Sequence, residues 1–347
     1  MTQDTLTQLI ESDLEPYVKE IDNGSYYPES FIKSLFKAQQ FTADDFVHNL
    51  KVIEKVGETC LTTAFCIWCQ WAFTTYLKHS SHNSEARKLY DQVFKGDIIG
   101  ATGLSNPMKS FSDLEKVNLN HYYKDGELYV NGTLPAISNI QSDHYFGAIS
   151  QDDETNETVM MILKADQEGV SISEMSNFLG VNGSATYRVN LDNVQVPSNR
   201  VLSKDAKAFA SAIRPEFILL QIPIALGAIQ SSLNHIESFK DQTAQSHVFI
   251  EYNVEKFHKQ FEQLHQEFYE KVTAHLDNLD QILLDAVRIK KELGYLLLEI
   301  NQAAMVYGGS RAYIEDSKPA IKLKEGFFFA ALTPTLRHLG KLEQELG

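Results

Sequence analysis

Cysteine is scarce in this 347-residue chain, and its three copies, Cys60, Cys66 and Cys69, all fall in one apolar stretch. An odd number of cysteines inside a single predicted helix argues against a disulfide framework and indicates a reducing compartment, so we predict a cytoplasmic protein. Cys66 and Cys69 have CxxC spacing, but no second pair of ligands lies nearby in the sequence. We therefore interpret the cysteines as small core residues rather than as a redox or zinc site.

Basic residues are also few, since 31 lysines and arginines face 46 aspartates and glutamates and give a formal net charge of −15. This balance argues against the broad basic face that grips nucleic acid, and it disfavours adsorption to anionic membranes. A small anionic ligand is still compatible with it, because a few local cations or backbone N–H groups can bind one. We expect neither a nucleic-acid partner nor a membrane partner.

The chain lacks the marks of a secretory signal, a membrane span and a metal motif. Its first 15 residues are acidic, with no basic segment followed by an apolar core. The most apolar run, residues 60–77, carries four threonines and a glutamine, which predicts a buried helix rather than a span. His258 and His265 lie on one predicted helix face without an HExxH spacing, so we expect no metal site.

Three regions with different residue patterns follow one another along the chain. Up to residue 95 the apolar residues repeat at helical spacing, as in Leu6, Ile10 and Leu14. From 96 to 202, short apolar or alternating runs are joined by turns, and Asp125-Gly126 between two such runs is a strong hairpin signal. From 203 onwards, long periodic segments predict a helical bundle, with Pro334 breaking the last of them. These segments are 217–239, 249–276, 279–306 and 321–346.

These three residue patterns predict an α+β protein with three parts. The first is an N-terminal helical domain over residues 1–95, and the last is a C-terminal four-helix bundle over residues 203–347. Between them we predict a β-domain over residues 96–202. Its strands are joined by short turns without intervening helices, which favours antiparallel pairing.

Four segments carry a resemblance to a known family. Residues 178–202, FLGVNGSATYRVNLDNVQVPSNRVL, fit the pattern with which acyl-CoA dehydrogenases close their β-domain. GDIIGATGLSNP (96–107), VNGT (130–133) and AAMVYGGS (303–310) fit three further segments of that family in the same order. The chain therefore resembles the acyl-CoA dehydrogenase superfamily over most of its length. Three pieces also have plainer interpretations: residues 105–107 as a turn, Asn131-Gly132 as a hairpin turn, and Gly308-Gly309 as a helix C-cap.

The resemblance implies the family's fold and a bound flavin, which would be FAD, or FMN if the chain is a monooxygenase. A flavin ring has an apolar body and a polar edge, so small and hydroxyl-bearing residues at a strand exit suit it. Glycine pairs would let the backbone approach the cofactor closely. The positions that match the family's flavin contacts are Thr102, Leu104, Ser105, Ala136, Ser138, Gly308 and Gly309.

Much of the family's active-site pattern is missing. Asn106 stands where the family has an acid, and Ala136 where it has a tryptophan beside the flavin. The arginine that grips the cofactor pyrophosphate is absent, and Lys240 could replace its charge but not its bidentate fork. No acid occupies residues 327–334, where most members keep the catalytic base. Glu216, near the position that other members use, is the candidate base; the alternative is a helix N-terminal glutamate favoured by the helix dipole.

Three functions are open at this point. The first is a flavin-dependent oxidoreductase that dehydrogenates an acyl thioester, with a small-molecule substrate such as an acyl-CoA and an electron-transfer flavoprotein as redox partner. The second is a two-component flavin monooxygenase fed by a flavin reductase, although the histidine of that branch is Leu332 here. The third is a non-catalytic member with a decayed flavin site. The resemblance also implies a homodimer or a homotetramer.

Overall fold

The first part of the chain is helical, as predicted. The computed structural model describes residues 3–175, 177–242 and 247–347. Short polar residues begin two of the early helices: Asp45 accepts a hydrogen bond from the His48 N–H, and Asn83 accepts from the Glu85 N–H. The α-helices are α1 (Gln3–Asp13), α2 (Val18–Asn23), α3 (Glu29–Lys37), α4 (Phe46–Thr59), α5 (Leu61–His79) and α6 (Ser84–Phe94).

Helix α5 is the buried helix that the sequence predicts at residues 60–77. Every residue from 61 to 77 is buried, because α5 packs against strand β1 (Gly100–Thr102) on one side and against other helices around it. Cys66 and Cys69 lie in this core, and burial raises the pKa of both thiols well above its ordinary value. Their interpretation as small core residues is confirmed.

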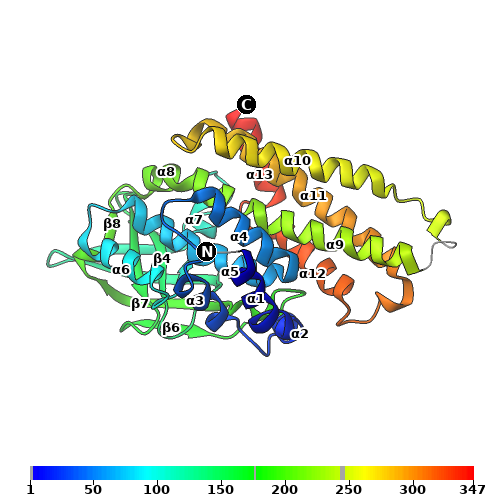
Figure 1. Cartoon of the computed structure of the whole chain (residues 1–347). Helices are drawn as coiled ribbons and strands as arrows, with labels where there is room; N and C mark the ends of the chain where they lie inside the picture. Colours follow the sequence, from blue (N-terminus) through cyan, green and yellow to red (C-terminus); the bar gives the residue numbers. More distant parts are fainter. Residues whose placement is uncertain (1–2, 176, 243–246) are drawn as a thin grey trace.

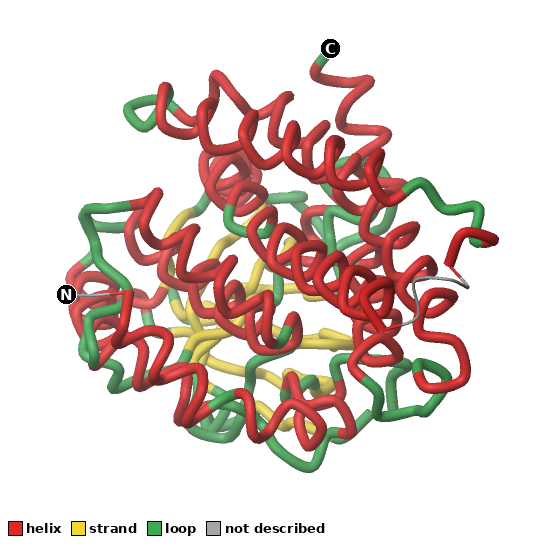
Figure 2. Tube along the Cα trace, turned by 45° about the vertical axis from the view of Figure 1, so that its right-hand side comes forward, coloured by secondary structure: helices red, strands yellow, loops and turns green. Residues whose placement is uncertain are grey.

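The described strands form one eight-stranded sheet (Figure 1). Its path runs β6-β7-β3-β2-β4-β5-β8, and β1 pairs with β4 off this path. Figure 2 shows the strands lying behind a layer of helices, which cover one face of the sheet. The remaining strands are β2 (Leu119–Lys124), β3 (Glu127–Ile137), β4 (Tyr145–Gln151), β5 (Thr158–Lys164), β6 (Val170–Ser173), β7 (Tyr187–Val196) and β8 (Val201–Ser203).

The hairpin signal is confirmed between β2 and β3. Asp125 and Gly126 have φ values of 53° and 87°, the left-handed conformation that a tight hairpin turn requires. Gly132 is not in a turn, so the plainer interpretation of Asn131-Gly132 is wrong. It lies within β3 at a shift of register, with φ 126°, and a Cβ there would lie 2.5 Å from the Asn118 carbonyl oxygen.

The sheet is antiparallel, as predicted, except at two pairs that the sequence did not reveal. Strand β4 runs parallel to β1 and to β2. Neither pair is joined by a tight turn, because β3 lies between β2 and β4 in the chain, and helix α7 (Ser105–Ser110), β2 and β3 lie between β1 and β4. The exit of β1 lies beside the end of β3, since a Cβ on Gly103 would meet the side chains of Leu134 and Ile137.

The last part of the chain is helical again, as predicted, but its first helix begins at Ala206 instead of near residue 217. The segment expected at 217–239 is two helices, interrupted at Leu220 and Gln221. Pro334 separates the last two helices, as predicted. Figure 1 shows α9, α10 and α11 extending together beyond the sheet. The helices are α8 (Ala206–Leu219), α9 (Ile222–Gln242), α10 (Val254–Ala274), α11 (Leu283–Gly308), α12 (Lys318–Ala331) and α13 (Leu336–Leu346).

Among the described residues, one stretch has the length and composition of a membrane span, and it is a core stretch. Ala206–Lys240 covers α8 and most of α9. Of its most apolar window, 83% is buried inside the molecule. Helix α9 packs against α4 and α11, so its apolar surface is used within the fold.

Candidate functional site

The exit of β1 and the end of β3 open into a cavity of about 210 Å³, which we call the inner cavity. It brings together four of the residues predicted to contact a flavin: Thr102, Ser105, Ala136 and Ser138. Helices α5, α8 and α12 close its other sides. Its lining comprises Phe65, Trp68, Cys69, Thr102, Ser105, Ala136, Ser138, Phe217, Phe328, Ala331, Leu332 and Thr333.

The polar groups of the inner cavity are hydroxyls held in pairs. The Ser105 and Thr333 hydroxyls lie 2.8 Å apart, although 228 residues separate them in the chain. The Ser138 hydroxyl is 2.6 Å from that of Thr186. Each pair joins two different segments, so the hydroxyls have defined positions. Thr186 also lies 2.7 Å from the Ser184 hydroxyl, which donates to the Val181 carbonyl, so Ser138 donates to Thr186 and keeps only acceptor capacity for a ligand.

Aromatic rings form the opposite wall. Phe65 and Trp68 of α5 lie in stacked orientation with centroids 5.8 Å apart, and Phe65 contacts Phe328 of α12 edge-on at 4.5 Å. Trp68 also contacts Phe217 of α8 at 4.9 Å and donates its indole N–H to that residue's carbonyl. Sequence reasoning missed this wall, because α5 is apolar on all faces and its pattern does not single out the face that meets a cavity.

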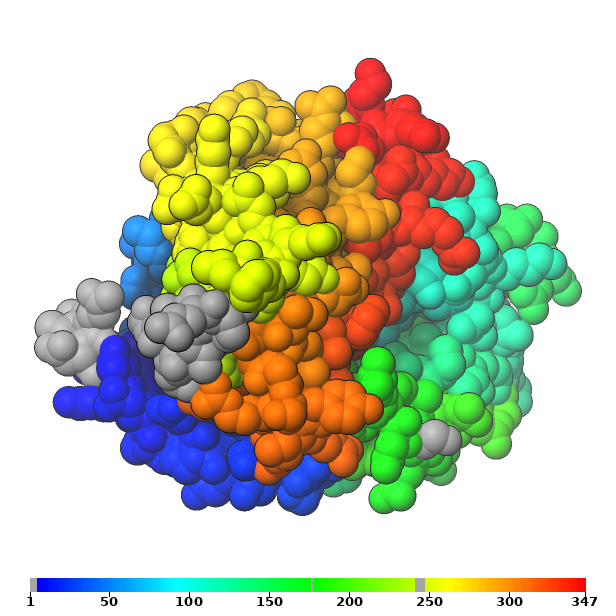
Figure 3. Space-filling view, turned by 90° about the vertical axis from the view of Figure 1, so that its right-hand side faces the viewer, coloured from blue at the N-terminus to red at the C-terminus, as the bar shows by residue number. Residues whose placement is uncertain are grey.

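A second cavity, of about 310 Å³, adjoins the first, and we call it the outer cavity. The two share Ala136, Ser138 and Phe328 in their linings. The apolar side chains at its mouth are partly exposed, Leu179 at 67% and Phe327 at 45%. Figure 3 shows this face of the molecule, where green chain near residue 180 lies beside the orange-red chain of α12. The other lining residues are Phe178, Gly180, Val181, Thr186 and Lys324.

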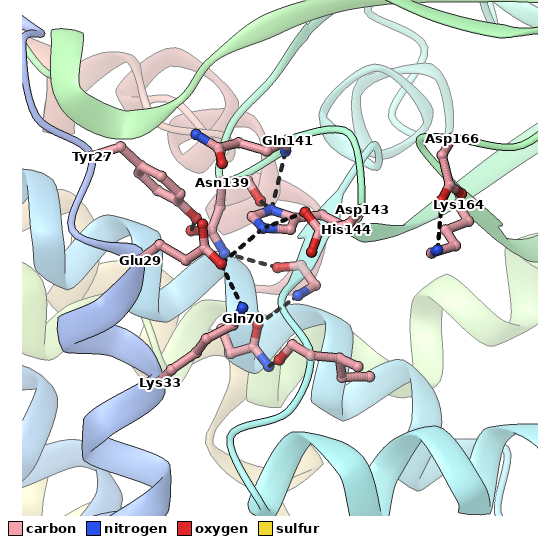
Figure 4. A network of polar contacts seen from close by, with 12 residues as sticks. Tyr27, Glu29, Lys33, Gln70, Asn139, Gln141, Asp143, His144, Lys164 and Asp166 are labelled. Atoms are coloured by element: carbon pink, nitrogen blue, oxygen red, sulfur yellow. Dashed lines mark hydrogen bonds and ion pairs between the residues drawn. The ribbon is translucent and has the colours of Figure 1, made fainter.

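A buried polar network lies behind the Ser138 end of the site (Figure 4). Asn139, fully buried with φ 62°, accepts a hydrogen bond from the Tyr27 hydroxyl at 2.6 Å and donates to the Gly100 carbonyl at 2.9 Å. Gln70 of α5 accepts from the Gly100 N–H at 2.6 Å. His144 lies 3.2 Å from the Asn139 carbonyl. The network therefore fixes the start of β1 to the turn that follows Ser138.

Two buried side chains donate hydrogen bonds to the backbone of the loop that carries Thr333. Lys290 of α11 donates to the carbonyls of Leu332 at 3.1 Å and Pro334 at 2.6 Å. Gln221 donates to the Thr333 carbonyl at 2.9 Å. Burial lowers the pKa of Lys290 well below its ordinary value. Neither residue was singled out in the sequence, since their roles depend on contacts far along the chain.

Leu104, Gly308 and Gly309 do not line either cavity. The Leu104 side chain is fully buried in the core, and its N–H lies 3.3 Å from the Thr102 hydroxyl. Gly308 ends α11, and Gly309 caps it with φ 56°, so the C-cap interpretation of this pair is confirmed. A Cβ on Gly308 would meet Phe239 of α9, which sets the glycine pair at the Lys240 end of that helix. Any flavin contact from this pair stays a prediction.

The structure does not bring Glu216 to the two cavities. Its carboxylate lies 3.0 Å from Lys78 and 3.2 Å from His79 and lines a separate cavity, although the next residue, Phe217, lines the inner one. Burial alone would raise its pKa, but the hydrogen bond from His79 and the charge of Lys78 hold the pKa below its ordinary value. The alternative of a helix N-terminal glutamate is wrong, because α8 begins at Ala206.

Across the described residues that line the inner and outer cavities, no carboxylate and no histidine is found. Lys324 is the one charged side chain among them. His338 is buried elsewhere, with its Nε2 atom 2.9 Å from the Ser112 hydroxyl. The arrangement can bind a flat molecule with a polar edge between hydroxyls and aromatic rings, but the described lining supplies no obvious proton acceptor.

Comparison with curated proteins gives distant relatives of one kind. A short-chain specific acyl-CoA dehydrogenase of Clostridium acetobutylicum is 21% identical over 229 residues, which cover 62% of this chain and 60% of that protein. A cyclohexane-1-carbonyl-CoA dehydrogenase of Geobacter metallireducens is 22% identical over 191 residues, which cover 53% and 50%. The matches thus span between 50% and 60% of the length of these two relatives. No protein-family model matches the chain.

Solved structures extend the likeness over nearly the whole chain. Butyryl-CoA dehydrogenase of Megasphaera elsdenii has a TM-score of 0.79 at 17% identity and covers 99% of this chain and 97% of its own. Dibenzothiophene monooxygenase of Paenibacillus sp. A11-2 has a TM-score of 0.79 at 14% identity, with coverage of 98% and 95%. At these identities the likeness establishes the fold.

Proposed function

We propose that this chain, a member of the acyl-CoA dehydrogenase superfamily by fold and by sequence relatives, is a flavin-dependent oxidoreductase that acts on an apolar small molecule. One observation carries the proposal: the inner cavity has paired hydroxyls on one side and a wall of aromatic rings on the other. A flavin ring needs a polar edge and an apolar face, and the cavity offers both.

The residues present fit the ring part of a flavin. Ala136 near the end of β3 and Ser138 just after it are small, so they present a surface that a flat ring can cover, and the Ser105 and Ser138 hydroxyls can hydrogen-bond its polar edge. The two adjoining cavities extend the space beyond the ring, and sites for small organic ligands typically enclose ~300–1,000 Å³. FAD is the form we expect, with FMN as the alternative for a monooxygenase.

Each group of the chain has a defined task in this proposal. The Ser105–Thr333 and Ser138–Thr186 pairs orient the ring, and the polar network behind Asn139 keeps β1 and β3 at a constant separation. Phe65, Trp68 and Phe328 hold an apolar substrate against the ring and exclude water from it. A bound flavin would supply the two-electron redox chemistry.

Two reactions are candidates for this site. Dehydrogenation of an acyl thioester, with an electron-transfer flavoprotein as acceptor, needs a carboxylate at the substrate. Glu216 could serve only if it left Lys78 and His79. Monooxygenation with reduced flavin from a partner reductase is the second candidate, and the absence of a carboxylate from the described lining of both cavities favours it. A non-catalytic role would follow if no flavin binds.

The test is flavin binding in both redox states. We expect purified protein to bind FAD or FMN, measured by fluorescence quenching for oxidised flavin and by anaerobic absorbance titration for photoreduced flavin. Bleaching of bound oxidised flavin by an acyl-CoA panel would support dehydrogenation. Tighter binding of reduced flavin, without bleaching, would support monooxygenation. Failure to bind either form would refute the proposal.

A substitution at Glu216 separates the two reactions further. If Glu216 is the base, Glu216→Gln should abolish substrate-dependent bleaching, a loss of ~100-fold or more in rate, while flavin affinity stays unchanged. Lys78→Gln is the matched control, because it removes a partner of Glu216 and keeps the carboxylate. Bleaching at the normal rate in Glu216→Gln would rule Glu216 out.

A further inference from the structure

Lys324 occupies a particular place in the site. It lines the outer cavity and is the one charged side chain among the described lining residues of both cavities. It stands on α12 four residues before Phe328, which lines both cavities, so the two positions are one helical turn, about 6 Å, apart along the helix axis. A cation thus lies one helical turn away from the aromatic wall of the cavity that we assign to the flavin ring.

Lys324 pairs with the carboxylate of Asp22, and that carboxylate lacks part of its hydrogen bonding. Its ammonium group donates to the carboxylate of Asp22 on α2, and the Lys324 side chain is 18% exposed. Asp22 itself is 7% exposed, and its Oδ1 atom has no hydrogen-bond partner among the described residues. Burial raises the pKa of Asp22 above its ordinary value in spite of the hydrogen bond from Lys324. Asp22 therefore holds the lysine with one oxygen and leaves the other unpaired.

We propose that Lys324 binds the phosphate of the flavin and exchanges Asp22 for it, an inference that rests on the proposed function. An ammonium group presents three donors, so it can take a phosphate oxygen as a point charge without the geometry of an arginine fork. The segment at Gly180 lies directly against it, since a Cβ there would lie 3.1 Å from the Lys324 carbonyl oxygen. The ribityl chain of a flavin is long enough to span the helical turn from Ser138 and Phe328 to this lysine.

Riboflavin and FMN provide the test, because they share the ring and differ in the phosphate. In the redox form that binds more tightly, we expect FMN to bind the wild-type protein about 10- to 100-fold more tightly than riboflavin, as a hydrogen bond between charged groups implies. Lys324→Met should remove this preference and leave riboflavin affinity unchanged. Lys324→Arg, which keeps a cation, should retain most of it.

Three further variants guard against unfolding and against a general charge effect. Asp22→Asn should tighten FMN about tenfold and riboflavin not at all, because the competing carboxylate is gone. The double variant Asp22→Asn, Lys324→Met leaves no unpaired buried charge and should again lack the preference. Lys318→Met is the matched control, since this exposed lysine of the same helix lies outside both cavities and its loss should change neither affinity.

The outcomes distinguish the two proposals. Riboflavin binding with no preference for FMN in the wild type, or a preference that survives in Lys324→Met and in the double variant, would overturn the role of Lys324 and leave the ring site standing. Binding of neither flavin would overturn the proposed function and the role of Lys324 with it. A preference lost with the lysine and strengthened without Asp22 would establish the phosphate contact.

Discussion

Single hydroxyl groups define the polar side of the candidate site. Ser105, Ser138, Thr186 and Thr333 each come from a different segment and meet in two pairs at 2.8 and 2.6 Å. Because a hydroxyl both donates and accepts, the Ser105–Thr333 pair can adjust to a ligand, whereas Ser138 donates to Thr186 and can only accept a hydrogen bond from one. The same small side chains leave the room that a flat ring needs.

Filling the space beside Ser138 with a large side chain should abolish flavin binding. Ser138→Trp places a large side chain where both cavities meet, so we expect flavin affinity to fall by ~100-fold or more while the protein stays folded. Fluorescence titration measures the affinity, and circular dichroism checks the fold. Ser173→Trp is the matched control, because Ser173 is an exposed residue of the same sheet. Undiminished affinity in Ser138→Trp would show that the ring binds elsewhere.

His338 should make the protein sensitive to mild acid. Burial, together with Arg214 and Lys290, lowers its pKa to about 4 in the folded protein, against 6.5 as the ordinary value. The unfolded chain therefore binds more protons than the folded one between pH 6.5 and 4, so stability falls as the pH drops through this window.

Replacing His338 should reduce the loss of folding stability at acidic pH. Between pH 7 and pH 5 we expect the free energy of unfolding of the wild type to fall by roughly 1–2 kcal/mol more than that of His338→Gln. Urea unfolding at the two pH values measures the difference. His82→Gln, an exposed histidine, is the control and should behave like the wild type. Equal losses in His338→Gln and the wild type would contradict the prediction.

At the scale of elements, α12 connects the site to the rest of the fold. Phe327 and Phe328 on this helix line the cavities, while Glu325 points the other way and is 1% exposed. Its carboxylate accepts from the Thr62 N–H at 3.1 Å at the start of α5 and from Lys322 at 3.0 Å. An acid on one helix thus caps the N-terminus of another, which fixes α12 against α5.

Removing the Glu325 carboxylate alone should destabilise the folded protein. Glu325→Ala leaves the Lys322 ammonium buried without its counter-ion, and we expect the free energy of unfolding to fall by ~3–5 kcal/mol. The double variant Glu325→Leu, Lys322→Met should recover most of this loss, since it leaves no unpaired charge. Urea unfolding provides both values. Asp316→Ala, which breaks an exposed pair with Lys19, is the control and should unfold like the wild type. Equal stability of Glu325→Ala and wild type would contradict the buried pair.

At the scale of the whole molecule, apolar residues are exposed at the end of the bundle farthest from the sheet. Phe249 is 84% exposed and Tyr313 85%. They come from segments that meet, because the His247 ring contacts the ring of Tyr307 near the end of α11. Exposed aromatic residues on neighbouring segments are typical of an interface between chains.

The resemblance predicts a homodimer or a homotetramer, and this end of the bundle offers a test. We expect light scattering after size exclusion to give a mass that is a multiple of 39.3 kDa. The double variant Phe249→Asp, Tyr313→Asp should lower that mass, because charges on an apolar interface disfavour association. Tyr123→Asp, at an exposed position of β2, is the control and should keep the wild-type mass. A wild-type mass of 39.3 kDa would refute the oligomer.

Much of the fold could be predicted because it depends on neighbours in the chain. The helical periodicity of the outer parts, the Asp125-Gly126 hairpin and the break at Pro334 are local effects of side-chain spacing and backbone dihedral preference. The match over residues 178–202 extended this local evidence to the whole architecture. It also led to the small and hydroxyl residues at the strand ends, four of which do line the inner cavity.

The sequence by itself therefore determined the three-part α+β architecture and singled out four residues that line the inner cavity, namely Thr102, Ser105, Ala136 and Ser138. Only the tertiary structure decided which groups meet there. It directed Glu216 towards Lys78 and His79, and it brought Thr333 to Ser105 across 228 residues of chain. It also left Lys324 at the outer cavity beside Asp22. The physical reason is that periodicity reveals that a helix has a buried face, whereas the partner of each side chain depends on how distant elements pack together.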